Sequence, residues 1–245
     1  MDRTPVTIDT RDGRCPASLF VPAGDAPRPA VIVYMDALGP RPALFALGER
    51  LAREGYVALL PDLFYRAGAY EPADFGMFRD PERRKQWFDR YVATASIANV
   101  TEDTRAFLDW LERRTEVRGA RVGVVGYCMG GSRALAAAGT FPERIAAAAS
   151  YHGGNLGTDA PDSPHRLAPA MKARVYVGGA SEDSSFPDDM KQRLIVAFAA
   201  AGVDATVETY PARHGWVLAD SPVHDEAMTE RHWQTLLALL ASTLH

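Results

Sequence analysis

The chain has 245 residues, of which 47% are hydrophobic and 24% charged, and its formal net charge is −4. A chain of this length and composition can bury one sizeable core, so we expect a single domain over residues 1–245. The 27 basic residues are spread among 31 acidic ones. This excludes the concentrated basic surface on which a nucleic-acid partner binds.

No apolar stretch reaches the roughly 18 residues that a membrane-spanning helix needs. The first ten residues also lack the apolar core of a signal peptide, so we expect a soluble, cytoplasmic protein with no membrane partner. Its two cysteines, Cys15 and Cys128, are too few for a disulfide framework, and no CxxC or HxxxH spacing indicates a metal site. A role for either cysteine would be that of a thiol.

The first predicted elements form an antiparallel hairpin, with strands over 6–10 and 15–22 and a turn at Asp12 and Gly13. Further apolar runs have the near-continuous hydrophobicity of strands that are buried on both faces of a parallel sheet. They cover residues 30–37, 56–63, 121–128, 145–154 and 173–179. A last strand is expected over 205–211.

Helical patterns lie between these strands, several of them with an acidic or hydroxyl residue at the start and a glycine near the end. They cover residues 43–55, 101–114, 131–140, 188–202 and 225–243. The alternation of strand and helix predicts an α/β fold with a doubly wound, mostly parallel sheet and an antiparallel N-terminal edge. Residues 66–100 mix loop signals with a charged helix and are expected to cover the carboxyl ends of the strands.

Polar residues that follow strands are the candidates for chemistry, because ligands of open α/β sheets bind outside the carboxyl ends of the strands. Asp36, Cys128, Asp183 and His214 each occupy such a position. Cys128 lies in "GYCMGG", the G-x-nucleophile-x-G-G form of a sharp turn between strand and helix. A thiol at the first turn of a helix meets the partial positive charge of the helix N-terminus, which favours the thiolate.

The order nucleophile, acid, histidine is the one that α/β-hydrolases use, and Cys128, Asp183 and His214 follow it. His214 is then the general base and Asp183 the carboxylate that orients it, with the neighbouring Glu182 as the alternative acid. Backbone N–H groups supply an oxyanion hole in this fold. We expect them from Met129, after the nucleophile, and from Ala37 or Leu38 in the loop after strand 30–35.

Several other residues have alternative interpretations. We expect Cys15 to be inert and His152 to be a pocket wall or a core histidine. Arg66 is interpreted as substrate-binding or as part of a surface salt bridge. Aromatic side chains are expected to line a pocket or to pack in the core, as such residues more often do: Tyr34, Phe64, Tyr127, Phe186 and Trp216. A dinucleotide site is excluded, since G-x-x-G-x-x-x-G-G is not G-x-G-x-x-G.

The combination of "GYCMGG", "EDSSFP", "ARHGW" and "LAREGYVALLPDLFYR" resembles the dienelactone hydrolase, or carboxymethylenebutenolidase, family over about residues 5 to 240. The resemblance implies an α/β-hydrolase fold, a Cys128, Asp183 and His214 triad, and no cofactor. It also implies attack of the Cys128 thiolate on a small ester or lactone and a covalent thioester intermediate.

Two positions depart from the family's pattern. The family's carboxylate that contacts the resting thiol is a glutamate, and the shorter Asp36 stands in its place. An arginine that holds the substrate's carboxylate shortly after the catalytic histidine is missing, since "HGWVLAD" brings Trp216 and apolar residues instead. Arg66, Arg83 and Arg84 are the candidates to replace it, and the substrate need not be dienelactone.

The resulting hypothesis is a hydrolase of a small ester or lactone. The alternatives are a broad carboxylesterase or thioesterase on the same triad, and a catalytically silent α/β-hydrolase domain that binds a small molecule. An intact triad argues against the silent domain. For the oligomeric state we expect a monomer or a dimer.

Overall fold

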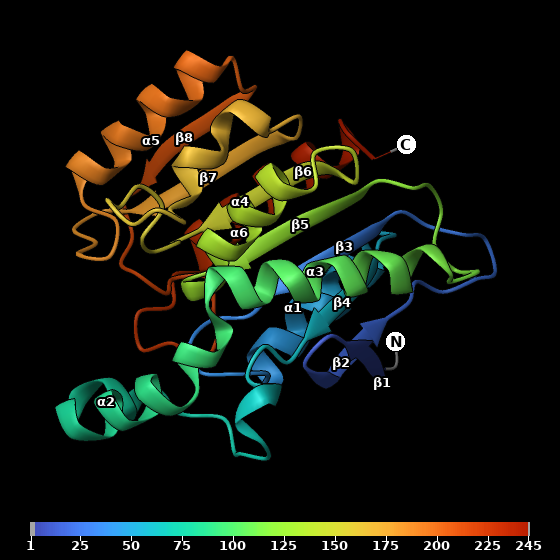
Figure 1. Ribbon diagram of the computed structural model, residues 1–245, viewed down its shortest axis with the longest axis horizontal. Helices are drawn as coiled ribbons and strands as arrows, with labels where there is room; N and C mark the ends of the chain where they lie inside the picture. Colours follow the sequence, from blue (N-terminus) through green and yellow to red (C-terminus); the bar gives the residue numbers. More distant parts are fainter. Residues whose placement is uncertain (1–2, 245) are drawn as a thin grey trace.

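The computed structural model describes residues 3–244, which form one eight-stranded sheet with helices on both faces (Figure 1). The strands are β1 (Arg3–Thr10), β2 (Gly13–Phe20), β3 (Ala30–Tyr34), β4 (Val57–Pro61), β5 (Val122–Tyr127), β6 (Ile145–Tyr151), β7 (Arg174–Ala180) and β8 (Ala205–Tyr210). Their order in the sheet is β1-β2-β4-β3-β5-β6-β7-β8. β1, β2 and β4 pair antiparallel, and every later pairing is parallel. The predicted fold class is confirmed.

The N-terminal hairpin turns one residue earlier than expected. Thr10 pairs with Gly13, so Arg11 and Asp12 form the turn and Gly13 is the first residue of β2. Gly13 has a φ of 139°, which a residue with a side chain rarely adopts. Its carbonyl oxygen accepts a 2.7 Å hydrogen bond from the Thr10 hydroxyl.

The helices are α1 (Pro42–Arg53), α2 (Pro81–Arg90), α3 (Ile97–Glu112), α4 (Met129–Thr140), α5 (Asp188–Ala201) and α6 (Glu226–Ala241). In Figure 1, α3, α4 and α5 lie in front of the sheet, and α1 and α6 lie behind it. Among residues 3–244, no helix combines the length and the apolarity needed to cross a membrane.

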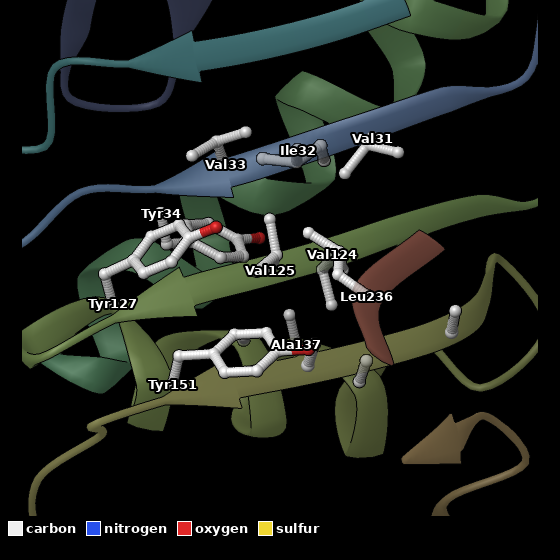
Figure 2. Packing of buried hydrophobic residues seen from close by; sticks show 14 of the residues in the cluster. Val31, Ile32, Val33, Tyr34, Val124, Val125, Tyr127, Ala137, Tyr151 and Leu236 are labelled. Atoms are coloured by element: carbon white, nitrogen blue, oxygen red, sulfur yellow. The ribbon is translucent and has the colours of Figure 1, made fainter. Parts of the chain in front are cut away.

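The core lies between the central strands and the helices on each side of them (Figure 2). β3 and β5 contribute branched side chains, whereas β6 and α4 are rich in alanine and therefore approach each other closely. The start of α4 also lies very close to the ends of β5 and β3. A Cβ on Gly126 would lie 2.0 Å from the Gly130 oxygen, and one on Gly130 would lie 2.2 Å from the Tyr34 oxygen. Only glycine fits at these two positions.

The segment between β4 and α3 lies beside the carboxyl ends of the strands, as expected, and contains the short helices η1 (Tyr65–Ala67), η2 (Phe75–Arg79) and η3 (Val92–Ala95) together with α2. No residue of α2 is buried, and Figure 1 shows this helix protruding from the body. Four aromatic rings pack against one another and anchor the segment: Phe64, Tyr70, Trp87 and Tyr91. We call residues 65–95 the covering segment.

Candidate active site

Cys128 lies on a sharp turn between β5 and α4, with φ 51° and ψ −113°. A positive φ is uncommon for a residue with a side chain and costs roughly 1–3 kcal/mol. The glycines on either side allow the backbone to bend there, and the thiol is half-buried at the first turn of α4. The turn therefore presents Sγ at the N-terminus of a helix, beside the carboxyl ends of the parallel strands.

His214 and Asp183 come from the loops after β8 and β7. The Nδ1 atom of His214 lies 2.7 Å from the Oδ2 atom of Asp183. The other carboxylate oxygen of Asp183 accepts hydrogen bonds from the Ser185 backbone N–H, at 2.9 Å, and from its hydroxyl, at 2.6 Å. The neighbouring Glu182 is exposed. The structure therefore brings Asp183, and not Glu182, to the imidazole.

The charges around His214 favour its protonated form. Burial opposes the imidazolium, but the Cys128 thiolate and the Asp183 carboxylate outweigh burial and raise the pKa of His214. Burial likewise opposes the charged form of Asp183, and the hydrogen bonds from His214 and Ser185 more than compensate, so that its pKa is lowered. Both shifts favour an ion pair between the His214 imidazolium and the Asp183 carboxylate.

Cys128 and His214 share a narrow cavity. Its wall also contains Asp36, Ala37, Leu38, Phe75, Phe78, His152, Gly215 and Leu218. The volume that the centres of water molecules can occupy in this cavity is about 30 Å³, which is enough for only a few waters. Phe75 and Phe78 belong to the covering segment, so this segment forms one side of the cavity.

The loop after β3 leaves one of its two candidate N–H groups free. The Leu38 N–H donates to the Asp36 Oδ1 atom at 3.0 Å, which differs from our expectation of an oxyanion donor because a local turn already uses this group. The N–H groups of Ala37 and Met129 donate to no residue in the described part of the chain. Both remain available as hydrogen-bond donors.

Asp36 belongs to a buried ion-pair cluster that sequence reasoning missed. Arg41 binds both of its carboxylate oxygens, at 2.7 and 2.8 Å, and also donates to the Gly39 carbonyl and to both carboxylate oxygens of Asp220. Arg41 has a side chain only 7% exposed. It follows Asp36 by five residues in a loop without periodicity, so no pattern marked it.

The model of the dienelactone hydrolase family matches residues 15–244, nearly the whole of this α/β sheet and every residue of the cavity. The chain belongs to the dienelactone hydrolase family. It is therefore a hydrolase with the α/β-hydrolase fold.

Individual members of the dienelactone hydrolase family are similar along most of the chain. A Salmonella typhi protein named "Putative carboxymethylenebutenolidase" is 28% identical over 222 residues, which are 89% of this chain and 79% of that protein. The carboxymethylenebutenolidase of Pseudomonas putida is 27% identical over 196 residues, 80% of this chain and 78% of that one. The crystal structure of a "Putative Dienelactone Hydrolase" from Klebsiella pneumoniae superposes with a TM-score of 0.85 at 26% identity and covers 98% of both chains.

Two aromatic residues that we expected in the substrate pocket of this family member lie behind the cavity. Tyr127 is fully buried, and its hydroxyl is 2.9 Å from the Nε2 atom of His232. Trp216 is also fully buried and stacks on Tyr210. Both side chains pack in the core, and neither lines the cavity. Tyr34, Phe64 and Phe186 are likewise buried and absent from the cavity wall.

The arginines named from sequence do not reach the cavity either. Arg66 donates to Asp12 and Asp103, two carboxylates at the N-terminal edge of the sheet, so its guanidinium is occupied. Arg83 and Arg84 lie on α2, over surface depressions that do not include Cys128. Neither arginine lines the cavity of Cys128.

Two further observations concern the second cysteine, Cys15, and the possibility of a metal site. Cys15 is buried in β2, its thiol donates to the Asp62 carbonyl oxygen at 3.4 Å, and burial raises its pKa. Within residues 3–244, no cluster of three or more His, Cys, Asp or Glu side chains is placed to hold a metal ion.

Proposed function

We propose that this protein hydrolyses small, uncharged esters or lactones through a thioester on Cys128. The observation that carries the proposal is the position of Cys128 on a strained turn, in one cavity with a histidine whose Nδ1 atom is 2.7 Å from the buried carboxylate of Asp183. With Nδ1 engaged, the Nε2 atom of His214 is the one left for the thiol and the substrate.

The first half of the reaction forms the thioester. The Cys128 thiolate donates an electron pair to the carbonyl carbon, and the carbonyl oxygen becomes an oxyanion between the N–H groups of Ala37 and Met129. Collapse of this intermediate breaks the carbon–oxygen bond, and the leaving alkoxide takes the Nε2 proton of the His214 imidazolium. An ester releases an alcohol, whereas the alcohol of a lactone stays attached to the acyl group.

The second half hydrolyses the thioester. Neutral His214 removes a proton from a water molecule, whose oxygen attacks the thioester carbon. Collapse breaks the carbon–sulfur bond and releases the carboxylic acid, while the thiolate and imidazolium pair forms again. Asp183 stays ionised throughout and holds the imidazole in one orientation.

The cavity wall favours an uncharged acyl group. Phe75, Phe78 and Leu218 give it an apolar surface, and the described residues that line it include no lysine or arginine. Asp36 also lines the cavity, but Arg41 already binds both of its carboxylate oxygens, so this pair offers no free positive charge to a negatively charged substrate.

Arg41, which binds Asp36 of this cavity wall, has no free N–H donor. A guanidinium has five N–H donors, and Arg41 uses all five on Asp36, Gly39 and Asp220. Arg213 precedes the catalytic histidine in sequence, but it is exposed and does not line the cavity. A substrate carboxylate would therefore be desolvated without a cationic partner, which is costly.

Steady-state hydrolysis of p-nitrophenyl acetate, a neutral lactone and cis-dienelactone tests both parts of the proposal. We expect turnover of the two neutral substrates, loss of it in Cys128→Ala, and unchanged turnover in the matched control Cys15→Ala. When the reaction with p-nitrophenyl acetate is stopped with acid, the peptide that contains Cys128 should carry one acetyl group.

The outcomes separate the alternatives. Turnover by Cys128→Ala equal to that of the parent would overturn the triad, and a failure to turn over any ester or lactone would favour the silent binding domain. Preference for acyl-thioesters would favour a thioesterase. Preference for dienelactone would contradict the uncharged substrate class, and Arg213→Gln would then show whether Arg213 binds the carboxylate.

A further inference from the structure

His152 is a second histidine in the cavity, and the proposed reaction does not use it. It follows β6, has a φ of 40° and is fully buried. Its ring lies 5.2 Å from the ring of His214, at an angle of 64°, and it lines the same cavity as Cys128. An imidazole at this position is close enough to the nucleophile to affect its geometry.

The contact that links His152 to Cys128 is a hydrogen bond from the backbone. The Cys128 N–H donates to the Nδ1 atom of His152 at 3.2 Å and, at 3.3 Å, to the carbonyl oxygen of Tyr151. Cys128 and His152 both have a positive φ, so the hydrogen bond joins two strained residues. Such backbone conformations persist only where surrounding contacts hold them.

This hydrogen bond determines where the proton of His152 lies. A nitrogen that accepts a hydrogen bond carries no proton, so the neutral ring has its proton on Nε2. The Nε2 atom is buried and has no hydrogen-bond partner within residues 3–244. A leucine or phenylalanine in this place would fill space without leaving a buried donor unpaired, which argues against a role in packing alone.

The surroundings keep His152 neutral. Burial is the largest cause, and the neighbouring His214 and His232 add to it, so the pKa of His152 lies well below its ordinary value. The other rings packed against it belong to Tyr127 and Trp216, and neither is a carboxylate that could pair with an imidazolium. The acceptor at Nδ1 is therefore retained while His214 is charged.

We propose that His152 is a positioning residue, whose neutral imidazole accepts the Cys128 N–H and thereby fixes the thiol sulfur relative to His214. The inference rests on the proposed function, because it assigns His152 a part in the reaction of Cys128. Without this acceptor, the Cys128 N–H keeps only its longer hydrogen bond to Tyr151, while the Cys128 carbonyl oxygen still accepts from the N–H groups of Gly131 and Gly154. The N–H side of the strained turn is then held less firmly, and Sγ moves away from its attacking position.

Two variants of similar size test the proposal. In His152→Asn the side-chain oxygen occupies the place of Nδ1 and can accept the N–H, whereas His152→Leu has no acceptor there. Asparagine also tolerates a positive φ better than leucine, so thermal stability alone is not informative. We would measure kcat and KM for p-nitrophenyl acetate, and the rate of Cys128 alkylation by iodoacetamide against pH, at a temperature at which all variants are fully folded.

The proposal predicts that His152→Leu lowers kcat by roughly threefold to tenfold, the effect of one hydrogen bond, with little change in KM. The midpoint of its alkylation curve should move to higher pH, because the thiolate is no longer held beside the imidazolium. His152→Asn should keep both values near those of the parent.

Two results would overturn the proposal: equal losses of kcat in both variants, or a loss in His152→Leu with an unchanged alkylation curve. Either would mean that His152 serves only to fill space. The failure of the proposed function looks different, because then Cys128→Ala would keep its activity whatever His152 does.

Discussion

The indole Nε1 atom of Trp87 donates a 2.7 Å hydrogen bond to the carbonyl oxygen of Ala37. Trp87 belongs to the covering segment, 50 residues along the chain from the loop that follows β3. The hydrogen bond holds Ala37 through its carbonyl oxygen, while its N–H donates to no residue in the described part of the chain. The covering segment thus supports the loop on which the proposed reaction depends.

Trp87→Phe removes this hydrogen bond and keeps an aromatic ring. We expect kcat for p-nitrophenyl acetate to fall by roughly threefold to tenfold, because one hydrogen bond that orients the loop is lost. KM should change little. Tyr91→Phe is the matched control, since Tyr91 packs in the same aromatic cluster and its ring remains. An equal loss of kcat in both variants would show that the cluster matters and the Ala37 contact does not.

The buried cluster of Asp36 and Arg41 predicts a non-additive effect on stability. Arg41→Gln leaves the Asp36 carboxylate buried without its partner, and we expect it to lower the free energy of unfolding by about 3–5 kcal/mol. Adding Asp36→Asn removes that unpaired charge and should restore a large part of the loss. Urea denaturation of the two single variants and the double variant measures the coupling, and strictly additive losses would contradict it.

Phe78 controls the size of the acyl group in our interpretation of the cavity. This residue is 38% exposed although it lines the cavity of Cys128. Phe78→Ala should raise the ratio of kcat/KM for p-nitrophenyl hexanoate to that for the acetate, because the wall moves back. Phe88→Ala is the control, since Phe88 contacts Phe78 from outside the cavity. An unchanged ratio in Phe78→Ala would place the acyl group elsewhere.

The buried His232 predicts that acid destabilises the protein. Burial is the main cause that lowers the pKa of His232 to about 3. Unfolded histidine has a pKa of about 6.5, so below that pH the unfolded chain binds a proton that the folded chain does not bind. Stability is therefore lost as the pH falls from about 6.5 towards 3, by up to about 1.4 kcal/mol per pH unit.

His232→Gln isolates this effect, because the amide can still bond to the Tyr127 hydroxyl but does not ionise. Between pH 6 and 4.5, we expect the free energy of unfolding to fall by about 2 kcal/mol less in the variant than in the parent. Urea titrations at the two pH values measure both slopes. Equal slopes would mean that His232 takes up its proton in the folded state as well.

Much of the fold could be predicted because the patterns that encode it are local. Strands buried on both faces read as continuous apolar runs, and each of the helices expected between them is present with ends that differ by a few residues. The predicted hairpin turn was one residue too late, at Asp12 and Gly13 instead of Arg11 and Asp12. By composition alone, either pair of residues can form a two-residue turn. α2 lay in the segment for which no clear pattern existed, since it buries none of its residues.

The amino-acid sequence by itself determined the order of the elements and the positions of Cys128, Asp183 and His214 at strand ends, because the glycines of the turn and the alternation of strand and helix are local properties. Only the tertiary structure decided which groups meet. It paired Arg41 with Asp36, turned Tyr127 and Trp216 into the core and brought the Nδ1 atom of His152 to the backbone N–H of Cys128. These contacts depend on distances between separate elements, and no spacing along the chain encodes such distances.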